Sequence, residues 1–303
     1  MSKVPLPKQP AALQSPIRTG PLCCEPICME PTFCPAGDIG GRFADRDKAS
    51  GPWMSPDRKL RAKGVRYLQV GGDTWNRCGP GWLNLDGNFD RGDGLPGGYV
   101  WPNTIFVDDT DRYNMKHVVS ASSRLPFADA SVQFVYTEHM MEHMLPLTGG
   151  GVNFLREAWR VLAPGGLLRI VTPDLAKYVC ALAGRGPPGS VENGFLEKHA
   201  ARFGPMEMMS NPPTRATITN NIFRNYGHEW IYDYEELRHA LRYAGVDPKL
   251  ACRSDRAGRG IPRWARLAIR RANQPHNETQ QCWLDQEVRE GESMYVNVLK
   301  PLV

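Results

Sequence analysis

The chain has 303 residues, 41% hydrophobic and 23% charged, which is typical of one globular domain with insertions or of two modest domains. The formal net charge of +5 is a mild excess that is not gathered in one block, so we expect no nucleic-acid partner. No apolar run approaches the roughly 20 residues that cross a bilayer, so we expect neither a membrane-spanning helix nor a membrane partner.

The N-terminal arm, residues 1–60, is rich in Pro, Gly and Cys and shows no sustained period. We expect it to be irregular, either folded over the body as a lid or disordered. Its first residues lack the apolar core of a signal peptide, which favours a cytoplasmic location and reduced thiols. The cysteines of the arm have no paired C-x-x-C spacing, so we expect no metal there.

Regular structure is predicted from Val65 onward. Apolar or β-branched runs that end in turn residues predict strands at 65–70, 82–85, 117–120 and 132–136. Helical spacing over 153–162 predicts a helix that the turn residues 163–166 end, and 167–171 is the next strand. Strands that alternate with helices or loops indicate a parallel sheet with crossover connections, and therefore an α/β fold.

The second half of the chain is predicted to be mainly helical. Residues 175–230 contain helical segments and no strong strand, so we expect a cap inserted into the domain formed by residues 61–303. A helix is predicted at 234–244 and a final strand at 293–299. The segment 261–271 fits a basic amphipathic helix with its apolar face on the domain; contact with a membrane surface or an acidic partner is the alternative.

Ligands of open α/β sheets bind beyond the carboxyl ends of the strands. Gly71 and Gly72 follow the first predicted strand and allow a ligand close to the backbone, although a plain tight turn is the alternative. Asp86 ends the second strand, where a carboxylate can accept both hydroxyls of a ribose or can simply cap a turn. Leu125 begins an apolar segment that can line an adenine ring.

Five segments in this order resemble the class I S-adenosylmethionine-dependent methyltransferases, most closely the bacterial type-11-like branch. The resemblance covers roughly residues 65–175, and more weakly 226–245 and 293–301. It implies a Rossmann-like class I sheet with helices on both faces and S-adenosylmethionine as the cofactor. The five segments are LQVGG at 68–72, GWLNLD at 81–86, LPFAD at 125–129, EHMMEH at 138–143 and RVLAPGG at 160–166.

The resemblance also implies roles in cofactor binding. Gly71 and Gly72 would pass under the methionine part of the cofactor, and Asp86 would hold its ribose. Where the family usually has another glycine, this chain has Asp73, whose carboxylate would meet the cofactor ammonium group or narrow the loop. The residues near the adenine would be Ser122, Arg124 and Leu125.

Catalytic and acceptor-binding roles are expected beyond the fourth strand. The resemblance places Glu138 and His139 beside the cofactor sulfur or the acceptor. A histidine near its usual pKa can accept a proton at neutral pH, and His139 and His228 are the candidates. His228 can equally be a hydrogen-bonded loop residue. The aromatic residues predicted to contact the substrate are Tyr178, Tyr226 and Trp230.

The segment His139-Met140-Met141-Glu142-His143 also spells H-x-x-E-H, an inverted zinc-protease motif. Such short motifs occur often by chance, and this one leaves the glycine turn and Asp86 unexplained. We therefore predict no metal site and expect Glu142 and His143 to cap and pack the helix after the fourth strand.

The function predicted from these features is methyl transfer from S-adenosylmethionine to a small-molecule acceptor, which the cap and the arm would enclose. One alternative is transfer or internal cyclisation of the aminocarboxypropyl chain, which releases methylthioadenosine. A second alternative is a cofactor-binding partner protein without catalysis. The sequence specifies neither the acceptor nor the oligomeric state.

Overall fold

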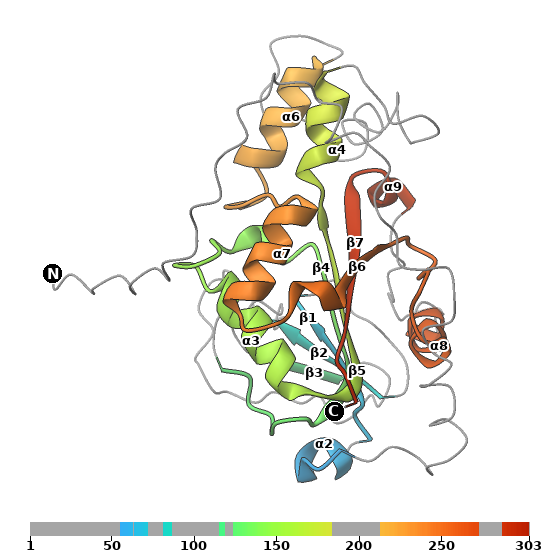
Figure 1. Ribbon diagram of the computed structural model, residues 1–303. Helices are drawn as coiled ribbons and strands as arrows, with labels where there is room; N and C mark the ends of the chain where they lie inside the picture. Colours follow the sequence, from blue (N-terminus) through green and yellow to red (C-terminus); the bar gives the residue numbers. More distant parts are fainter. Residues whose placement is uncertain are drawn as a thin grey trace, which may run out of the picture.

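The computed structural model describes residues 55–62, 64–71, 81–86, 115–118, 124–183, 213–272 and 287–302. At its centre lies a seven-stranded sheet of order β3-β2-β1-β4-β5-β7-β6 (Figure 1). The strands are β1 (Tyr67–Val70), β2 (Trp82–Asp86), β3 (Met115–Val118), β4 (Val132–Glu138), β5 (Leu162–Pro173), β6 (Ala251–Ser254) and β7 (Ser293–Leu299).

The first five strands run parallel to one another, as the alternation of elements predicts. Strand β1 pairs with β2 on one side and with β4 on the other, so the chain order reverses between β1 and β4. Strand β7 inserts antiparallel between β5 and β6. The predicted Rossmann-like α/β fold is confirmed, and the switch point between β1 and β4 is where such sheets bind ligands.

The sequence missed two features of this sheet. Strand β6 has only four residues, too few to show a period, and it forms by pairing with β7. The segment 163–166 ends helix α3 (Gly151–Val161) as predicted, but it continues directly into β5 rather than forming a separate turn. The register of β4 and β5 shifts at this point, which is how the strand accommodates the Pro-Gly-Gly residues.

Helices cover both faces of the sheet (Figure 1). One face packs against α3 and α7 (Tyr234–Tyr243) through a core that includes Leu68, Leu85, Phe154 and Leu237. Full burial of an aliphatic or aromatic side chain contributes about 1.5–3 kcal/mol. This core therefore holds the central strands and the two helices together.

The opposite face packs against α8 (Arg263–Ala272), the basic amphipathic helix that the sequence predicts. Its Ala265 and Ala268 are buried against the sheet, and Trp264 contacts the rings of Tyr67 and Phe134. The apolar face of this helix thus lies on the domain, as predicted. No helix among the described residues has the length and apolar content needed to cross a membrane.

Helices α4 (Leu175–Leu182) and α6 (Arg215–Arg224) stand side by side beyond the sheet (Figure 1). They pack through a separate small core of Tyr178, Ile218, Ile222 and Ile231. Both helices fall within the segment predicted as a cap.

Two expectations about the N-terminal part and the cysteines need correction. Residues 58–60 of the predicted irregular arm belong to helix α2 (Arg58–Ala62), because Asp57 Oδ1 accepts hydrogen bonds from the N–H groups of Lys59 and Leu60. Residues 1–54 lie outside the described residues. The expectation of reduced thiols is wrong for Cys180 and Cys252, which are disulfide-bonded.

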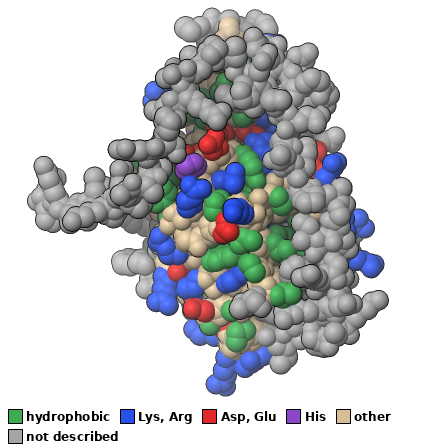
Figure 2. All heavy atoms as spheres, in the orientation of Figure 1, with side chains coloured by type: hydrophobic (Ala, Val, Ile, Leu, Met, Phe, Trp, Pro, Cys, Tyr) green, Lys and Arg blue, Asp and Glu red, His purple; other side chains and the backbone are tan. Residues whose placement is uncertain are grey.

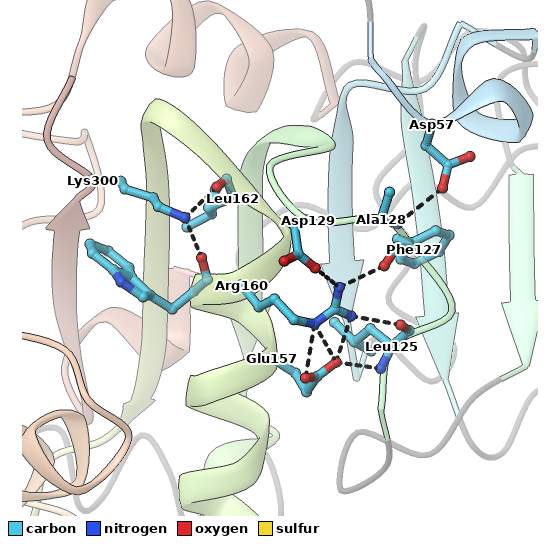
Figure 3. Close-up of polar contacts among 10 residues, drawn as sticks. Asp57, Leu125, Phe127, Ala128, Asp129, Glu157, Arg160, Leu162 and Lys300 are labelled. Atoms are coloured by element: carbon cyan, nitrogen blue, oxygen red, sulfur yellow. Dashed lines mark hydrogen bonds and ion pairs between the residues drawn. The ribbon is translucent and has the colours of Figure 1, made fainter. Parts of the chain in front are cut away.

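Arg160 of helix α3 binds the segment that precedes β4 (Figure 3). The Arg160 guanidinium contacts both carboxylate oxygens of Glu157 and donates to the carbonyl oxygens of Leu125 and Phe127. It also forms an ion pair of 2.7 Å with Asp129. The loop that leads into β4 is therefore held at the amino end of the sheet by groups of the last turns of α3.

Candidate functional site

The site begins at the carboxyl ends of β1, β2 and β4. Val70 pairs with Leu85 on one side and with Thr137 on the other, and the Gly71 N–H donates to the Leu85 carbonyl at 2.8 Å. Gly71, Asp86 and Glu138 therefore follow one another across the edge at the switch point. The parallel register thus brings Gly71 and Asp86, both predicted at this edge, together with Glu138, which the family resemblance placed here.

Gly71 is a position where only glycine fits. Its φ is +73°, and a Cβ added there would lie 2.0 Å from Met140 Cγ and 2.5 Å from Met140 Cβ. The turn after β1 thus runs directly against the side chain that follows His139. A backbone without a side chain at this point suits the close approach of a ligand.

Glu138 and His139 leave the end of β4 in different environments. Glu138 is half-buried, and the Tyr136 hydroxyl donates to its Oε2 at 2.8 Å. His139 has a φ of +49°, a left-handed conformation that costs about 1–3 kcal/mol in a residue with a side chain. Strain of this kind is typical of functional sites. The left-handed backbone of His139 turns the chain away from β4 and into the site.

Both ring nitrogens of His139 have partners. Nδ1 lies 3.0 Å from Glu142 Oε1, and Nε2 lies 2.9 Å from the hydroxyl oxygen of Ser293 at the start of β7. Nε2 is also 3.9 Å from Glu292 Oε1. The ring is therefore held between a carboxylate on one side and a hydroxyl on the other.

Glu142 is the fully buried centre of the site. Its Oε2 accepts a hydrogen bond of 3.1 Å from the Thr172 hydroxyl, and its carbonyl accepts from the N–H groups of Glu229 and Trp230. Burial raises the pKa of this carboxyl, but the neighbouring histidines outweigh burial, His139 most of all, and the net pKa lies below its usual value. Glu142 is therefore an anion at neutral pH.

His228 joins this group from the segment after α6. Its Nδ1 lies 2.6 Å from the Ile222 carbonyl, and its Nε2 lies 4.0 Å from Glu142 Oε1. Burial lowers the pKa of His228 more than the Glu142 charge raises it, so the ring is neutral at neutral pH. His143 lies beside it, with the two ring centroids 4.9 Å apart.

The predicted substrate residues occupy different positions around this centre. Tyr178 is buried on α4, and its hydroxyl donates to Glu292 Oε2 at 2.6 Å. Burial, followed by the Glu292 charge, raises the pKa of Tyr178 well above its usual value. Tyr226 is exposed with its ring 5.5 Å from that of His228, and Trp230 is also exposed.

The structure does not describe several of the predicted cofactor residues. Gly72, Asp73 and Ser122 lie outside the described residues, as does the Asp86 side chain. Leu125 does not agree with its predicted role, because its side chain is core and its N–H donates to Glu157 while its carbonyl accepts from Arg160. Arg124 is exposed beside it, at the amino end of β4.

The H-x-x-E-H segment forms a different structure from the protease motif. Only Met141–His143 is helical, a single 3-10 turn, and His139 precedes it with its left-handed backbone. The two histidines of the motif therefore do not share a helix face. Glu142 does not cap this turn either; it anchors the site, which the spacing alone did not indicate.

The sequence also missed the contribution of the far end of the chain. Ser293 reaches the site because β7 pairs with β5, where Ser293 lies opposite Pro173; Glu292 precedes it, and its carbonyl accepts from the Asp174 N–H. No local motif marks these two residues. Only the strand pairing brings them to His139.

Comparisons with known proteins give one family match over part of the chain and several structural similarities at low identity. A family model described as "Methyltransferase domain" matches residues 105–170. No curated protein sequence matches the chain. Among solved structures, the chain is similar to a Haloferax volcanii methyltransferase complexed with the Trm112 activator, at 14% identity and a TM-score of 0.39, covering 87% of this chain and 95% of that one.

Two further similar structures are the YcgJ protein of Bacillus subtilis and an S-adenosylmethionine-dependent methyltransferase of Mesorhizobium loti. Their identities are 12% and 14%, and the TM-score is 0.35 for both. Each match covers 80% of this chain and 96% of the other. Similarity at this level carries no weight for function.

The strand order is that of a Rossmann-like α/β sheet, and the methyltransferase-domain match covers β3, β4, α3 and most of β5 within it. This match over residues 105–170 indicates a transferase enzyme that uses S-adenosylmethionine as its cofactor. Its general activity is methyl transfer from that cofactor.

Proposed function

We propose that the enzyme methylates a small molecule that binds beside His139, between the carboxyl edge of the sheet and the α4–α6 helices. The observation that carries this proposal is the meeting of the Gly71 turn with the His139–Glu142 pair. The Gly71 turn suits a nucleoside cofactor, and the His139–Glu142 pair suits proton transfer.

The residues at the edge fit the cofactor. Gly71 has no Cβ, so the chain can pass close beneath a ligand, and Asp86 ends the neighbouring strand at the same level. Gly71 and Gly72 would contact the amino-acid part of the cofactor, Asp73 its ammonium group and Asp86 its ribose, while Ser122 would lie near the adenine. Arg124 lies at the opposite edge of the sheet, beside Leu125, and is not part of this proposal. When bound, S-adenosylmethionine supplies an electrophilic methyl group on a sulfonium.

His139 is the proposed proton acceptor. Glu142, buried and anionic, holds the Nδ1 side of the ring at 3.0 Å, which leaves Nε2 to face Ser293 and an incoming proton. A buried carboxylate that orients a histidine in this way stabilises the protonated ring. Glu138, at the end of β4, would face the acceptor beside it, and His228 would support the pair through Glu142.

The acceptor is proposed to contact the aromatic residues of the segment after α6. Tyr226 and Trp230 are both exposed on this segment, and Tyr178 lies on α4. Backbone hydrogen bonds from Glu229 and Trp230 to the Glu142 carbonyl tie the segment to the catalytic residues. An acceptor enclosed between a sheet edge and two helices fits a metabolite better than a polymer.

Replacement of Asp86 by alanine is expected to abolish S-adenosylmethionine binding, because the ribose would lose its carboxylate partner. Calorimetric titration of the wild type and Asp86→Ala with S-adenosylmethionine and S-adenosylhomocysteine measures this directly. After prolonged incubation of the wild type with S-adenosylmethionine and small-molecule extracts, mass analysis should find S-adenosylhomocysteine as the nucleoside product.

Asp247→Ala is the matched control, since it removes an exposed carboxylate that caps a turn far from the site. It should bind both nucleosides as the wild type does. Methylthioadenosine as the product would contradict methyl transfer and would favour aminocarboxypropyl chemistry. Absence of heat with wild-type protein would mean that the fold is retained without its activity.

A further inference from the structure

Three side chains with metal-ligating atoms converge from two distant segments of the chain. Glu142 and His143 come from the turn after β4, and His228 comes from the segment after α6. Each offers one ligand atom, and these three atoms lie within 4.8 Å of one another. Figure 2 shows a histidine side chain beside acidic side chains on the surface below α4 and α6, whereas Glu142 itself is buried.

In both His143 and His228, the hydrogen bond of Nδ1 leaves Nε2 available to bind a metal ion. His228 Nδ1 lies 2.6 Å from the Ile222 carbonyl, and His143 Nδ1 lies 3.2 Å from the Gly227 carbonyl. A carbonyl oxygen only accepts, so both Nδ1 atoms carry the proton, and both Nε2 atoms keep a free electron pair. Metal-binding histidines typically donate their other ring N–H to such a carbonyl, which fixes the tautomer and the ring orientation.

The carboxylate of Glu142 is a second, independent indication of a metal site. Glu142 is fully buried, and its Oε2 is satisfied by Thr172, whereas its Oε1 lies 3.0 Å from His139 Nδ1 without an aligned hydrogen bond from the described residues. Oε1 lies 4.0 Å from His228 Nε2, too far for a hydrogen bond. Two ligands that are each about 2.1 Å from one tetrahedral ion are about 3.4 Å apart. The 4.0 Å pair would therefore close by about 0.6 Å, and no pair of the three ligand atoms, all within 4.8 Å of one another, would close by more than about 1.4 Å.

We propose that Glu142, His143 and His228 bind a divalent transition-metal ion at the acceptor side of the site. Two imidazoles and one carboxylate suit zinc, iron, manganese or cobalt in the divalent state. Three protein ligands leave at least one coordination position open to water or to another ligand. This proposal does not depend on methyl transfer, because it concerns only the binding of an ion.

Metal binding can be tested with Co²⁺, whose visible absorption reports the donor atoms. Full-length protein is treated with a chelator, desalted and titrated with Co²⁺. One equivalent should bind and produce visible bands of nitrogen and oxygen coordination, without the near-ultraviolet band of cobalt–thiolate bonds. That last criterion separates this site from binding by the cysteines.

Variants identify the ligands. His143→Ala removes an exposed side chain and should leave the fold intact, while His228→Ala and Glu142→Gln remove the two more buried ligands. Each should weaken Co²⁺ binding by at least about a hundredfold, since loss of supporting residues alone costs 10–100-fold. His239→Ala, which removes a histidine of α7 outside the cluster, should bind Co²⁺ like the wild type.

The proposal is overturned if metal-free wild type binds no Co²⁺, or if His143→Ala and His228→Ala bind it as tightly as the wild type. Circular dichroism confirms that each variant is folded before it is titrated. A parallel calorimetric titration with S-adenosylmethionine, without metal, shows whether the cofactor site is intact. Loss of metal binding with retained cofactor binding is the expected result for His143→Ala.

Discussion

Gly71→Ala is expected to lower the affinity for S-adenosylmethionine by at least about tenfold, an energy change of about 1.4 kcal/mol. The new Cβ would lie 2.0 Å from Met140 Cγ, so either the turn after β1 or the segment that carries His139 must move. Overpacking of this kind typically costs about 1–3 kcal/mol of stability as well. Calorimetric titration and thermal unfolding measure the two effects separately.

Gly64→Ala is the matched control for this substitution. Gly64 has nearly the same backbone conformation, with a φ of +69°, but nothing lies within 4 Å of the position of an added Cβ. This variant should be less stable by only about 1–2 kcal/mol, which is the cost of a left-handed backbone at alanine. It should retain cofactor binding. Equal cofactor affinity in both variants and the wild type would contradict a role for the Gly71 turn in binding.

Arg160→Met is expected to destabilise the fold by about 2–3 kcal/mol, because it leaves a largely buried carboxylate and two carbonyl oxygens without their donor. The side chains of Arg160 and Glu157 are only 17% and 10% exposed, so water replaces little of what is lost. The loop from Leu125 to Asp129 would detach from α3 (Figure 3). Urea unfolding of both proteins measures the difference in free energy.

Asp129→Asn tests the exposed ion pair of Arg160 apart from its buried contacts. The Asp129 side chain is 76% exposed, so its ion pair with Arg160 is screened by water and its removal should leave the unfolding midpoint unchanged. A large loss in Asp129→Asn with none in Arg160→Met would contradict this account of the network.

The pH dependence of stability provides a separate test of Glu157. Burial raises the pKa of its carboxyl, but the hydrogen bonds from Arg160 and from the Leu125 N–H outweigh burial, and the net pKa lies below the usual 4.5. A group with a lowered pKa in the folded state stabilises the protein above its unfolded pKa and loses that contribution as the pH falls. The advantage of the wild type over Glu157→Gln in urea unfolding should therefore be full at neutral pH and shrink below about pH 4.5.

Local patterns in the chain were sufficient for the main strands and for the edge at which their carboxyl ends meet. The apolar runs that become β1, β2 and β4 can be recognised from a few consecutive residues, and each ends at a residue proposed to bind the cofactor or acceptor. Parallel strands place their carboxyl ends on one edge, so the Gly71 turn and Asp86 were predicted to lie there from the strand pattern, whereas Glu138 was placed there by the family resemblance. The amphipathic helix α8 was predicted for the same reason, since its apolar period is local.

The interior of the site was decided only by the tertiary structure, because its contacts join segments far apart in the chain. Glu142 becomes the centre of the site when Thr172 of β5 and His228 after α6 close around it, and Glu292 and Ser293 arrive through the antiparallel pairing of β7 with β5. Leu125 lies in a motif that resembles a cofactor segment. Its N–H is hydrogen-bonded to Glu157 and its carbonyl to Arg160, both on α3, so its role is structural. Buried charges and polar groups select their partners by three-dimensional proximity, which residue spacing along the chain does not encode.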